Sequence, residues 1–205
     1  MEMNAWAELN AARSAGPANP DLTAPRPLKL TIADLEALDR TWLDDALHGS
    51  ELIDGRVYFT PARYPHRARA TGELHARLHD ALKALGSTLW AGIRCSIAIP
   101  PHDLPLPDLL LTDEPRGEGF VPARSVPLVI EVAESALEFY AGPKAAAYAC
   151  GGIAEYWIVD LPGRALHRLS TPRAGGYVDG EIIALGGRAR CTAVAGLAVD
   201  TDGLV

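Results

Sequence analysis

Apolar side chains recur at helical spacing in one long stretch of the chain. From Ala70 to Leu85 they fall at every third or fourth position, and Gly86 follows the last of them. This period predicts an amphipathic helix over residues 65–85. A shorter helix is predicted after Thr31, whose hydroxyl suits a helix N-cap.

Short apolar runs between and after these helices predict the strands of a sheet. The predicted strands cover residues 87–100, 106–112, 127–133, 155–160, 164–169 and 177–185. The second and third runs are almost continuously apolar, which is typical of central strands covered on both faces. Residues 51–61 form two apolar runs around Asp54-Gly55, the strongest short-range signal for a tight hairpin.

A helix is predicted between the strands 127–133 and 155–160. It starts at Gly142-Pro143, because proline suits the first helical position, and it ends at Gly151-Gly152. A strand, a helix and a second strand make a crossover unit whose two strands are parallel. The remaining strands look antiparallel, so we expect an α/β fold with a mixed sheet and helices on its faces.

Composition bounds the domain organisation and the location. The chain has 205 residues, of which 48% are hydrophobic, with no break in composition. We therefore expect a single domain over residues 28–205, preceded by a flexible arm over residues 1–27 that mixes Ala, Asn and Pro without periodicity. The first residues have neither a basic start nor a long apolar run, so we expect a cytoplasmic protein with no membrane partner.

Charge and cysteine content exclude some functions. The formal net charge of -7 disfavours a general nucleic-acid coat, since such binding rests on positive charge, but it leaves room for a local basic cleft. Three cysteines far apart in the sequence argue against both a disulfide framework and a CxxC metal knuckle.

Two acidic residues stand inside apolar strands and need a compensating partner. Asp108 lies in Pro-Leu-Pro-Asp-Leu-Leu-Leu, and Glu131 lies in Pro-Leu-Val-Ile-Glu-Val. An uncompensated carboxylate there would cost several kcal/mol, and a cation shared by both acids would remove both penalties. Oxygen ligands without His or Cys at zinc spacing favour Mg²⁺ or Mn²⁺. The alternative is that each acid caps a strand end or pairs with an arginine.

Two further residues are candidates to support such a site. Lys144 falls in the first turn of the helix predicted after the Glu131 strand, and side chains lean toward a helix N-terminus. We expect Lys144 to reach toward Glu131 and to orient a water or a phosphate; the alternative is a solvated lysine. Glu51, at the start of the hairpin, is either a supporting acid or a surface residue.

Cationic side chains gather at the start of the long helix. His66, Arg67 and Arg69 belong to a basic segment in a chain that is acidic elsewhere. The segment predicts either a phosphate-contacting face for nucleic acid or an ordinary solvated helix face. His66, near the helix start, is also suited to binding an anion.

The order of these motifs resembles the Uma-two family of endonucleases, which is found widely in bacteria and is placed in the PD-(D/E)XK, restriction-endonuclease-like superfamily. The resemblance covers about residues 30–169. It is carried by Glu51-Leu-Ile-Asp-Gly, Pro61 with His66, Pro107-Asp108-Leu, Leu128-Val-Ile-Glu-Val, Lys144 with Tyr148, and Glu155-Tyr-Trp-Ile-Val-Asp. Two positions depart from the family pattern: Tyr140 stands where an aspartate is usual, and Ser50 where a tyrosine is usual.

The resemblance implies a fold and a set of roles. The fold is a restriction-endonuclease-like mixed β-sheet flanked by helices, with an additional N-terminal hairpin and C-terminal antiparallel strands. Asp108 and Glu131 correspond to the two acids of the motif, and with the Val132 carbonyl they would hold Mg²⁺. Lys144 corresponds to the motif lysine moved onto the following helix, because position 133 is Ala. Glu51 corresponds to an additional acid, and His66 to a histidine of the first long helix.

These observations together predict a Mg²⁺-dependent endonuclease that hydrolyses phosphodiester bonds of DNA, with Mn²⁺ as a second possible cofactor. The alternative is a catalytically inactive binding or regulatory module on the same fold, in which Tyr140 marks the loss of catalysis. A third interpretation is an arginine-paired core without a ligand. Since nuclease folds often dimerise to cut both strands, a homodimer is a plausible assembly.

Overall fold

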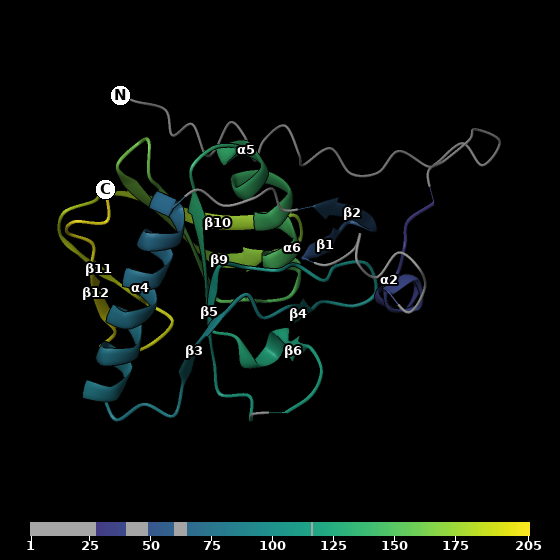
Figure 1. The fold of residues 1–205 in the computed structure, drawn as a ribbon, viewed down its shortest axis with the longest axis horizontal. Coiled ribbons are helices and arrows are strands. Elements are labelled where there is room, and N and C mark those ends of the chain that lie inside the picture. Colours follow the sequence, from purple (N-terminus) through teal and green to yellow (C-terminus); the bar gives the residue numbers. More distant parts are fainter. Residues whose placement is uncertain (1–27, 40–48, 60–64, 116) are drawn as a thin grey trace.

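The chain folds around a six-stranded mixed sheet. The structure is a computed structural model that describes residues 28–39, 49–59, 65–115 and 117–205, so the predicted flexible arm lies outside the described residues. The strands follow the order β10-β9-β8-β7-β5-β3 (Figure 1). They are β3 (Trp90–Ile93), β5 (Leu109–Thr112), β7 (Leu128–Ala133), β8 (Glu155–Asp160), β9 (Ala165–Arg173) and β10 (Gly176–Ala184). β7 and β8 pair in parallel and all other neighbours in this sheet are antiparallel, as the sequence predicts.

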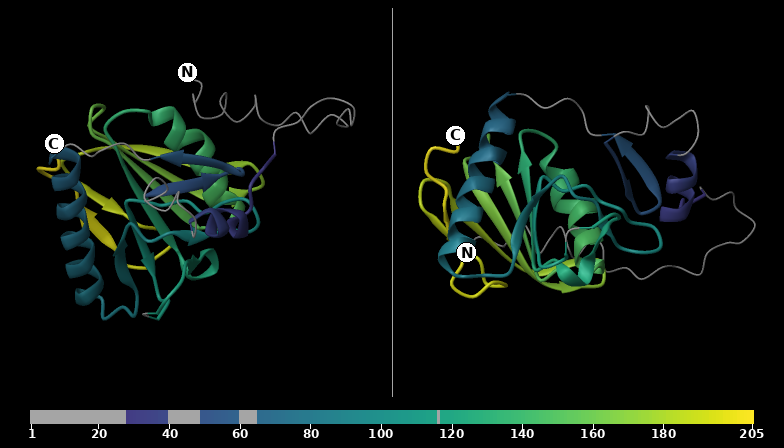
Figure 2. Two further views of the ribbon diagram at one scale, coloured as in Figure 1. Left: turned by 45° about the vertical axis from the view of Figure 1, so that its right-hand side comes forward. Right: turned by 60° about the horizontal axis from the view of Figure 1, so that its bottom comes forward.

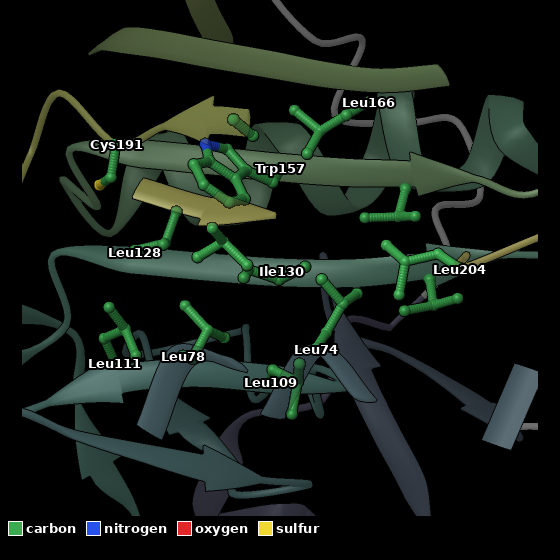
Figure 3. Close-up of a cluster of buried hydrophobic side chains, with 14 of the residues drawn as sticks. Leu74, Leu78, Leu109, Leu111, Leu128, Ile130, Trp157, Leu166, Cys191 and Leu204 are labelled. Atoms are coloured by element: carbon green, nitrogen blue, oxygen red, sulfur yellow. The ribbon is translucent and has the colours of Figure 1, made fainter. Parts of the chain in front are cut away.

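Helix α4 (Pro65–Ala84) covers one face of this sheet (Figure 2). Its apolar stripe, including Leu74 and Leu78, packs against side chains of the central strands such as Leu109 and Ile130 (Figure 3). The helix ends where the sequence predicts, because Gly86 adopts a φ of 61° and lets the following amide bond back to the last turn. This packing holds the first turn of α4 against the sheet.

A second helical segment covers the opposite face. It consists of α5 (Leu137–Phe139), a π-helical turn (Tyr140–Lys144) and α6 (Ala145–Cys150). The prediction that this helix starts at Gly142-Pro143 is wrong, because it starts at Leu137 and takes Pro143 into its interior. Proline has no N–H to donate, and the wider π-helical turn accommodates it without ending the helix. Lys144 therefore lies in the π-helical turn and not in a first turn.

The predicted hairpin consists of β1 (Ser50–Ile53) and β2 (Arg56–Phe59). Asp54 and Gly55 have φ values of 51° and 73°, which suit a two-residue turn with both residues left-handed. Backbone hydrogen bonds of 3.2 and 2.8 Å join Leu52 to Leu104, in the segment that leads into β5. The hairpin thus delivers the residue before Leu52, Glu51, to the end of the main sheet.

Helix α2 (Ile32–Asp39) begins at the predicted cap. The Thr31 amide donates to Asp34 Oδ2 at 2.8 Å, and the Asp34 amide donates to Thr31 Oγ1 at 3.2 Å. This reciprocal pair satisfies two amides that the first turn leaves without helical partners.

The strand predicted over residues 87–100 is interrupted. Arg94 adopts a φ of 51° and ends β3, after which β4 (Ile97–Ala98) pairs in parallel with β6 (Val121–Pro122) in a small sheet. A short 3-10 helix (Ala123–Ser125) follows β6. At the C-terminal end β11 (Arg188–Arg190) and β12 (Ala198–Asp200) form a further antiparallel pair.

The structure also bears on the predictions about cysteines and membranes. Cys95, Cys150 and Cys191 are free thiols. In the described part of the chain, no helix combines the length and the apolar character that crossing a membrane requires.

Candidate functional site

The two predicted acids lie side by side at one end of the central strands. β5 and β7 pair with Leu109 opposite Ile130, so one further step of the register puts Asp108 opposite Glu131. The Val132 amide donates to Asp108 Oδ2 at 2.8 Å, which fixes Asp108 against β7. Both side chains are almost fully buried, at 0% and 1% exposure.

Arg67 provides the counter-charge of Asp108. Its Nη2 donates to Asp108 Oδ2 at 2.9 Å and to the Tyr140 hydroxyl at 3.1 Å. The guanidinium is buried, so Arg67 does not lie on a solvated helix face, and its predicted contact with phosphate stays a prediction. The physical reason for this burial is that the first turn of α4 lies over the start of β5, where the buried Asp108 carboxylate requires a cation.

Lys144 lies between Glu131 and a third acid, Glu51. Its Nζ lies 2.6 Å from Glu131 Oε1 and 2.8 Å from Glu51 Oε2, and its side chain is 2% exposed. The predicted reach of Lys144 toward Glu131 is therefore present. Glu51 also accepts the Leu106 amide at 3.1 Å and is buried, so it is not a surface residue, and its role as a supporting acid stays a prediction.

Tyr148 also belongs to the cluster, although in the sequence it stands out only as part of the family resemblance. Its hydroxyl donates to Glu131 Oε1 at 2.7 Å, on the same oxygen that Lys144 contacts. Tyr148 follows Lys144 by four positions, which places both side chains on one helix face. That spacing is the signal in the sequence that would have found it.

Tyr140 lies between the two cations. Its ring centroid is 5.9 Å from the Arg67 guanidinium and 5.7 Å from Lys144 Nζ, within the range of cation–π contacts. Burial, and then the Glu131 carboxylate, raise the pKa of the Tyr140 phenol, so the ring remains neutral. Tyr140 therefore occupies the middle of the cluster as an uncharged side chain.

The electrostatics of the cluster follow from its charge count. It holds three carboxylates and two cations, hence one excess negative charge when all are ionised. Burial raises the pKa of Glu131 to about 7; Lys144 opposes this rise, and Asp108 and Glu51 add to it. Burial by itself would lower the pKa of Lys144, but the attraction of the Glu131 and Glu51 carboxylates is larger, so the pKa of Lys144 is raised. Lys144 is thus an ammonium ion at neutral pH.

The donor set fits a small hard cation. Glu131 receives both of its hydrogen bonds on Oε1, and within the described residues no hydrogen bond uses Oε2. Carboxylate oxygens, with the main-chain carbonyl of Val132 next in the strand, are the ligands that Mg²⁺ and Mn²⁺ prefer. Among the side chains that the structure describes, no three His, Cys, Asp or Glu residues gather closely enough to hold a metal by themselves. Waters would have to complete the coordination.

The remaining predicted site residues lie on the exposed start of α4. His66 contacts Glu134 through Nδ1 at 2.8 Å, and its side chain is 53% exposed. Arg69 is exposed and donates to Glu73 at 2.7 Å, one turn further along the helix. The phosphate-contacting role of these two residues stays a prediction.

Comparison with known proteins first gives the class of the fold. A solved structure described as a putative nuclease belonging to DUF820, from Anabaena variabilis ATCC 29413, matches this chain with a TM-score of 0.65. The match covers 87% of this chain and 97% of the other, at 15% identity. The two proteins therefore share a fold, and it is the mixed α/β fold that the sequence predicts, with a mixed sheet between helices and small antiparallel sheets at the ends.

The family follows from the sequence. The model of the Uma2 family, described as "Putative restriction endonuclease", matches residues 32–201. The chain belongs to this family, which confirms the resemblance seen in the motifs. No curated protein matches the chain.

Proposed function

We propose that this protein is a metal-dependent endonuclease that hydrolyses phosphodiester bonds of DNA at the Asp108–Glu131 cluster. The observation that carries the proposal is the buried Lys144 ammonium, which lies between Glu51 and Glu131. Hydrophobic residues of similar volume would stabilise a core at least as well as buried ion pairs do. A cluster of five buried charges is therefore better explained by chemistry than by stability.

Asp108, Glu131 and the Val132 carbonyl are the residues that would hold the metal. Mg²⁺ or Mn²⁺ bound there would supply Lewis-acid stabilisation of the charge that develops on the phosphoryl oxygens. The excess negative charge of the cluster and the Glu131 Oε2 atom favour a cation at this place. Arg67 and the Val132 amide hold the Asp108 carboxylate in a fixed orientation.

Lys144 acts through its charge and not as a base. An ammonium ion has no lone pair with which to accept a proton from water, and Glu51 and Glu131 together keep Lys144 in that form. Lys144 would therefore orient a water or a phosphate oxygen by attraction, while Glu51 fixes the position of the ammonium. Tyr148 fixes the Glu131 oxygen that Lys144 also contacts.

A second function, DNA binding without turnover, is favoured by one specific observation. Tyr140 fills the space between Arg67 and Lys144 at a position where the family usually carries an aspartate. If the missing carboxylate is required for a step of catalysis, the protein would bind DNA and leave it intact.

The test is cleavage of plasmid DNA in Mg²⁺ and, separately, in a chelator. We expect cleavage by the wild type in Mg²⁺ and a loss of two or more orders of magnitude in Glu131→Gln, as for the removal of an essential charged group (~10²-fold or more). Glu118→Gln, at an exposed acid in the loop after β5, is the matched control and should cleave like the wild type. Full activity of Glu131→Gln would refute the proposal, and binding by fluorescence anisotropy without cleavage by the wild type would favour the second function.

A further inference from the structure

His66 and Glu134 form a hydrogen-bonded pair beside the proposed site. The distance from His66 Nδ1 to Glu134 Oε1 is 2.8 Å. Both partners lie close in sequence to residues of the site. His66 directly precedes Arg67, which contacts Asp108. Glu134 follows the last residue of β7 and comes three positions after Glu131. The pair therefore lies at the same end of the sheet as the acids.

The hydrogen bond decides which nitrogen of His66 faces outward. A carboxylate only accepts, so Nδ1 of the ring carries the proton that lies between His66 and Glu134. Within the described residues His66 makes no other hydrogen bond, and its side chain is 53% exposed. Nε2 is thus the nitrogen available to a molecule that binds at the site. A carboxylate that fixes an imidazole by Nδ1 and leaves Nε2 available is a recurring arrangement in acid–base catalysis.

The other side chains near the acids that carry a proton are less suited to giving it up. Arg67 is held by Asp108 and Tyr140, and an arginine does not deprotonate in proteins. Lys144 is buried between two carboxylates that raise its pKa. Burial raises the pKa of the Tyr140 phenol. His66 is the exposed member of this set, and each nitrogen of an imidazole ring can carry a proton or accept one.

We propose that His66 is the general acid of the nuclease reaction and that Glu134 is its positioning residue. The inference rests on the proposed function. In the step, the oxygen of a water forms a bond to phosphorus while the bond from phosphorus to the leaving sugar oxygen breaks. The Nε2 proton of the imidazolium passes to the leaving oxygen, and the attacking water releases one proton to the solvent. The products are a phosphomonoester and an alcohol, and neutral His66 regains its proton from solvent.

A comparison of two substrates tests this role. DNA has a poor leaving group that needs a proton, whereas the p-nitrophenyl ester of thymidine 5′-phosphate releases a stable anion. We expect His66→Ala to lower kcat on DNA by ~10²-fold or more, with little change in KM, and to leave hydrolysis of the nitrophenyl ester within a few-fold of wild type. His79→Ala, an exposed histidine on the same helix, is the control and should change neither rate.

Two outcomes of this comparison would overturn the inference while leaving the proposed function intact. An equal loss on both substrates would show that His66 binds phosphate, and no loss on either would show that it has no part in the reaction. A wild type that cleaves neither substrate in Mg²⁺ or Mn²⁺ would overturn the proposed function and the inference together.

The role of Glu134 has a readout that does not depend on activity. In nitrogen NMR spectra of the neutral imidazole, we expect the wild type to carry the proton of His66 on Nδ1 and Glu134→Ala to shift it toward Nε2. Glu134→Gln keeps an acceptor oxygen, so it should retain the wild-type tautomer and more of the cleavage rate than Glu134→Ala does. A wild-type ring protonated on Nε2, or a tautomer unchanged in Glu134→Ala, would refute the positioning role.

Discussion

The buried Glu131 carboxylate makes the stability of the metal-free protein depend on pH. Burial is the main cause that raises its pKa from 4.5 to about 7, with Lys144 opposing and Asp108 and Glu51 adding to the rise. A carboxyl group with a raised pKa binds its proton more tightly in the folded chain than in the unfolded chain. Its stabilising contribution is therefore fully present below pH 4.5 and is lost as the pH rises through about 7.

The magnitude follows from the two pKa values. Each pH unit of difference corresponds to about 1.4 kcal/mol, so a rise from 4.5 to about 7 is equivalent to about 3 kcal/mol. Because Glu131 is fully buried, solvent screening does not reduce this figure appreciably. The free energy of unfolding should thus lose about 3 kcal/mol through this one group between about pH 4.5 and about pH 8.

The assay is urea unfolding across this pH range, with a chelator present, for the wild type and Glu131→Gln. The amide does not titrate, so Glu131→Gln should lack this part of the pH dependence. Its free energy of unfolding, taken relative to that of the wild type, should therefore rise by about 3 kcal/mol from the acidic to the alkaline end of the range. The substitution also weakens the contact with Lys144, but a loss of stability that is the same at every pH does not affect how the free energy of unfolding changes with pH. Glu118→Gln is the control for an exposed acid. Parallel curves for wild type and Glu131→Gln would refute the reasoning.

Three further changes have defined consequences. Lys144→Met leaves two buried carboxylates without their ammonium and should lower the free energy of unfolding, measured in urea, by ~3–5 kcal/mol. The control is Lys83→Met, at the end of α4, which should change it by less than about 0.5 kcal/mol. Glu155→Ala removes the acceptor of the Thr192 and Ala193 amides and should cost about 3 kcal/mol; amide exchange that stays slow at these two positions would contradict this. Leu78→Ala opens a cavity under α4 and should cost ~2–5 kcal/mol by thermal unfolding; a Tm equal to wild type would contradict that packing.

Much of the fold could be predicted because the apolar pattern is regular where burial is complete. β5 and β7 are buried along their whole length, so Asp108 and Glu131 stand out in the sequence as polar interruptions of apolar runs. The Asp54-Gly55 turn could be predicted because few dipeptides accept two left-handed residues. The interruption of β3 at Arg94 could not, because an arginine gives no local signal for that backbone conformation.

The candidate site could be predicted in its acids and less well in its cations. Lys144 could be placed near Glu131 from chain order alone, because the helix follows the Glu131 strand directly. Arg67 could not be placed, since its burial depends on how α4 crosses the start of β5, a contact between segments far apart in sequence. The π-helical turn at Pro143 was also hidden, because a glycine and proline together are more typical of a helix start.

Glu155 shows the limit of reading a buried acid as a functional residue. It is fully buried, as are Asp108 and Glu131, yet its carboxylate accepts hydrogen bonds from Trp157 Nε1 and from the Thr192 and Ala193 amides. These bonds attach the segment before β12 to the main sheet. Among the described residues only neutral donors contact this carboxylate, whereas the acids of the candidate site contact cations.

The most direct test of the metal site is a calorimetric titration of Mn²⁺ and Mg²⁺ into the protein at low ionic strength. The comparison is between the wild type and a double variant with Asp108→Asn and Glu131→Gln, with Glu118→Gln as the control. We predict binding to the wild type and the control and a loss of binding in the double variant. No binding to the wild type, even with DNA present, or equal binding to the double variant, would contradict the assignment of these acids as a metal centre.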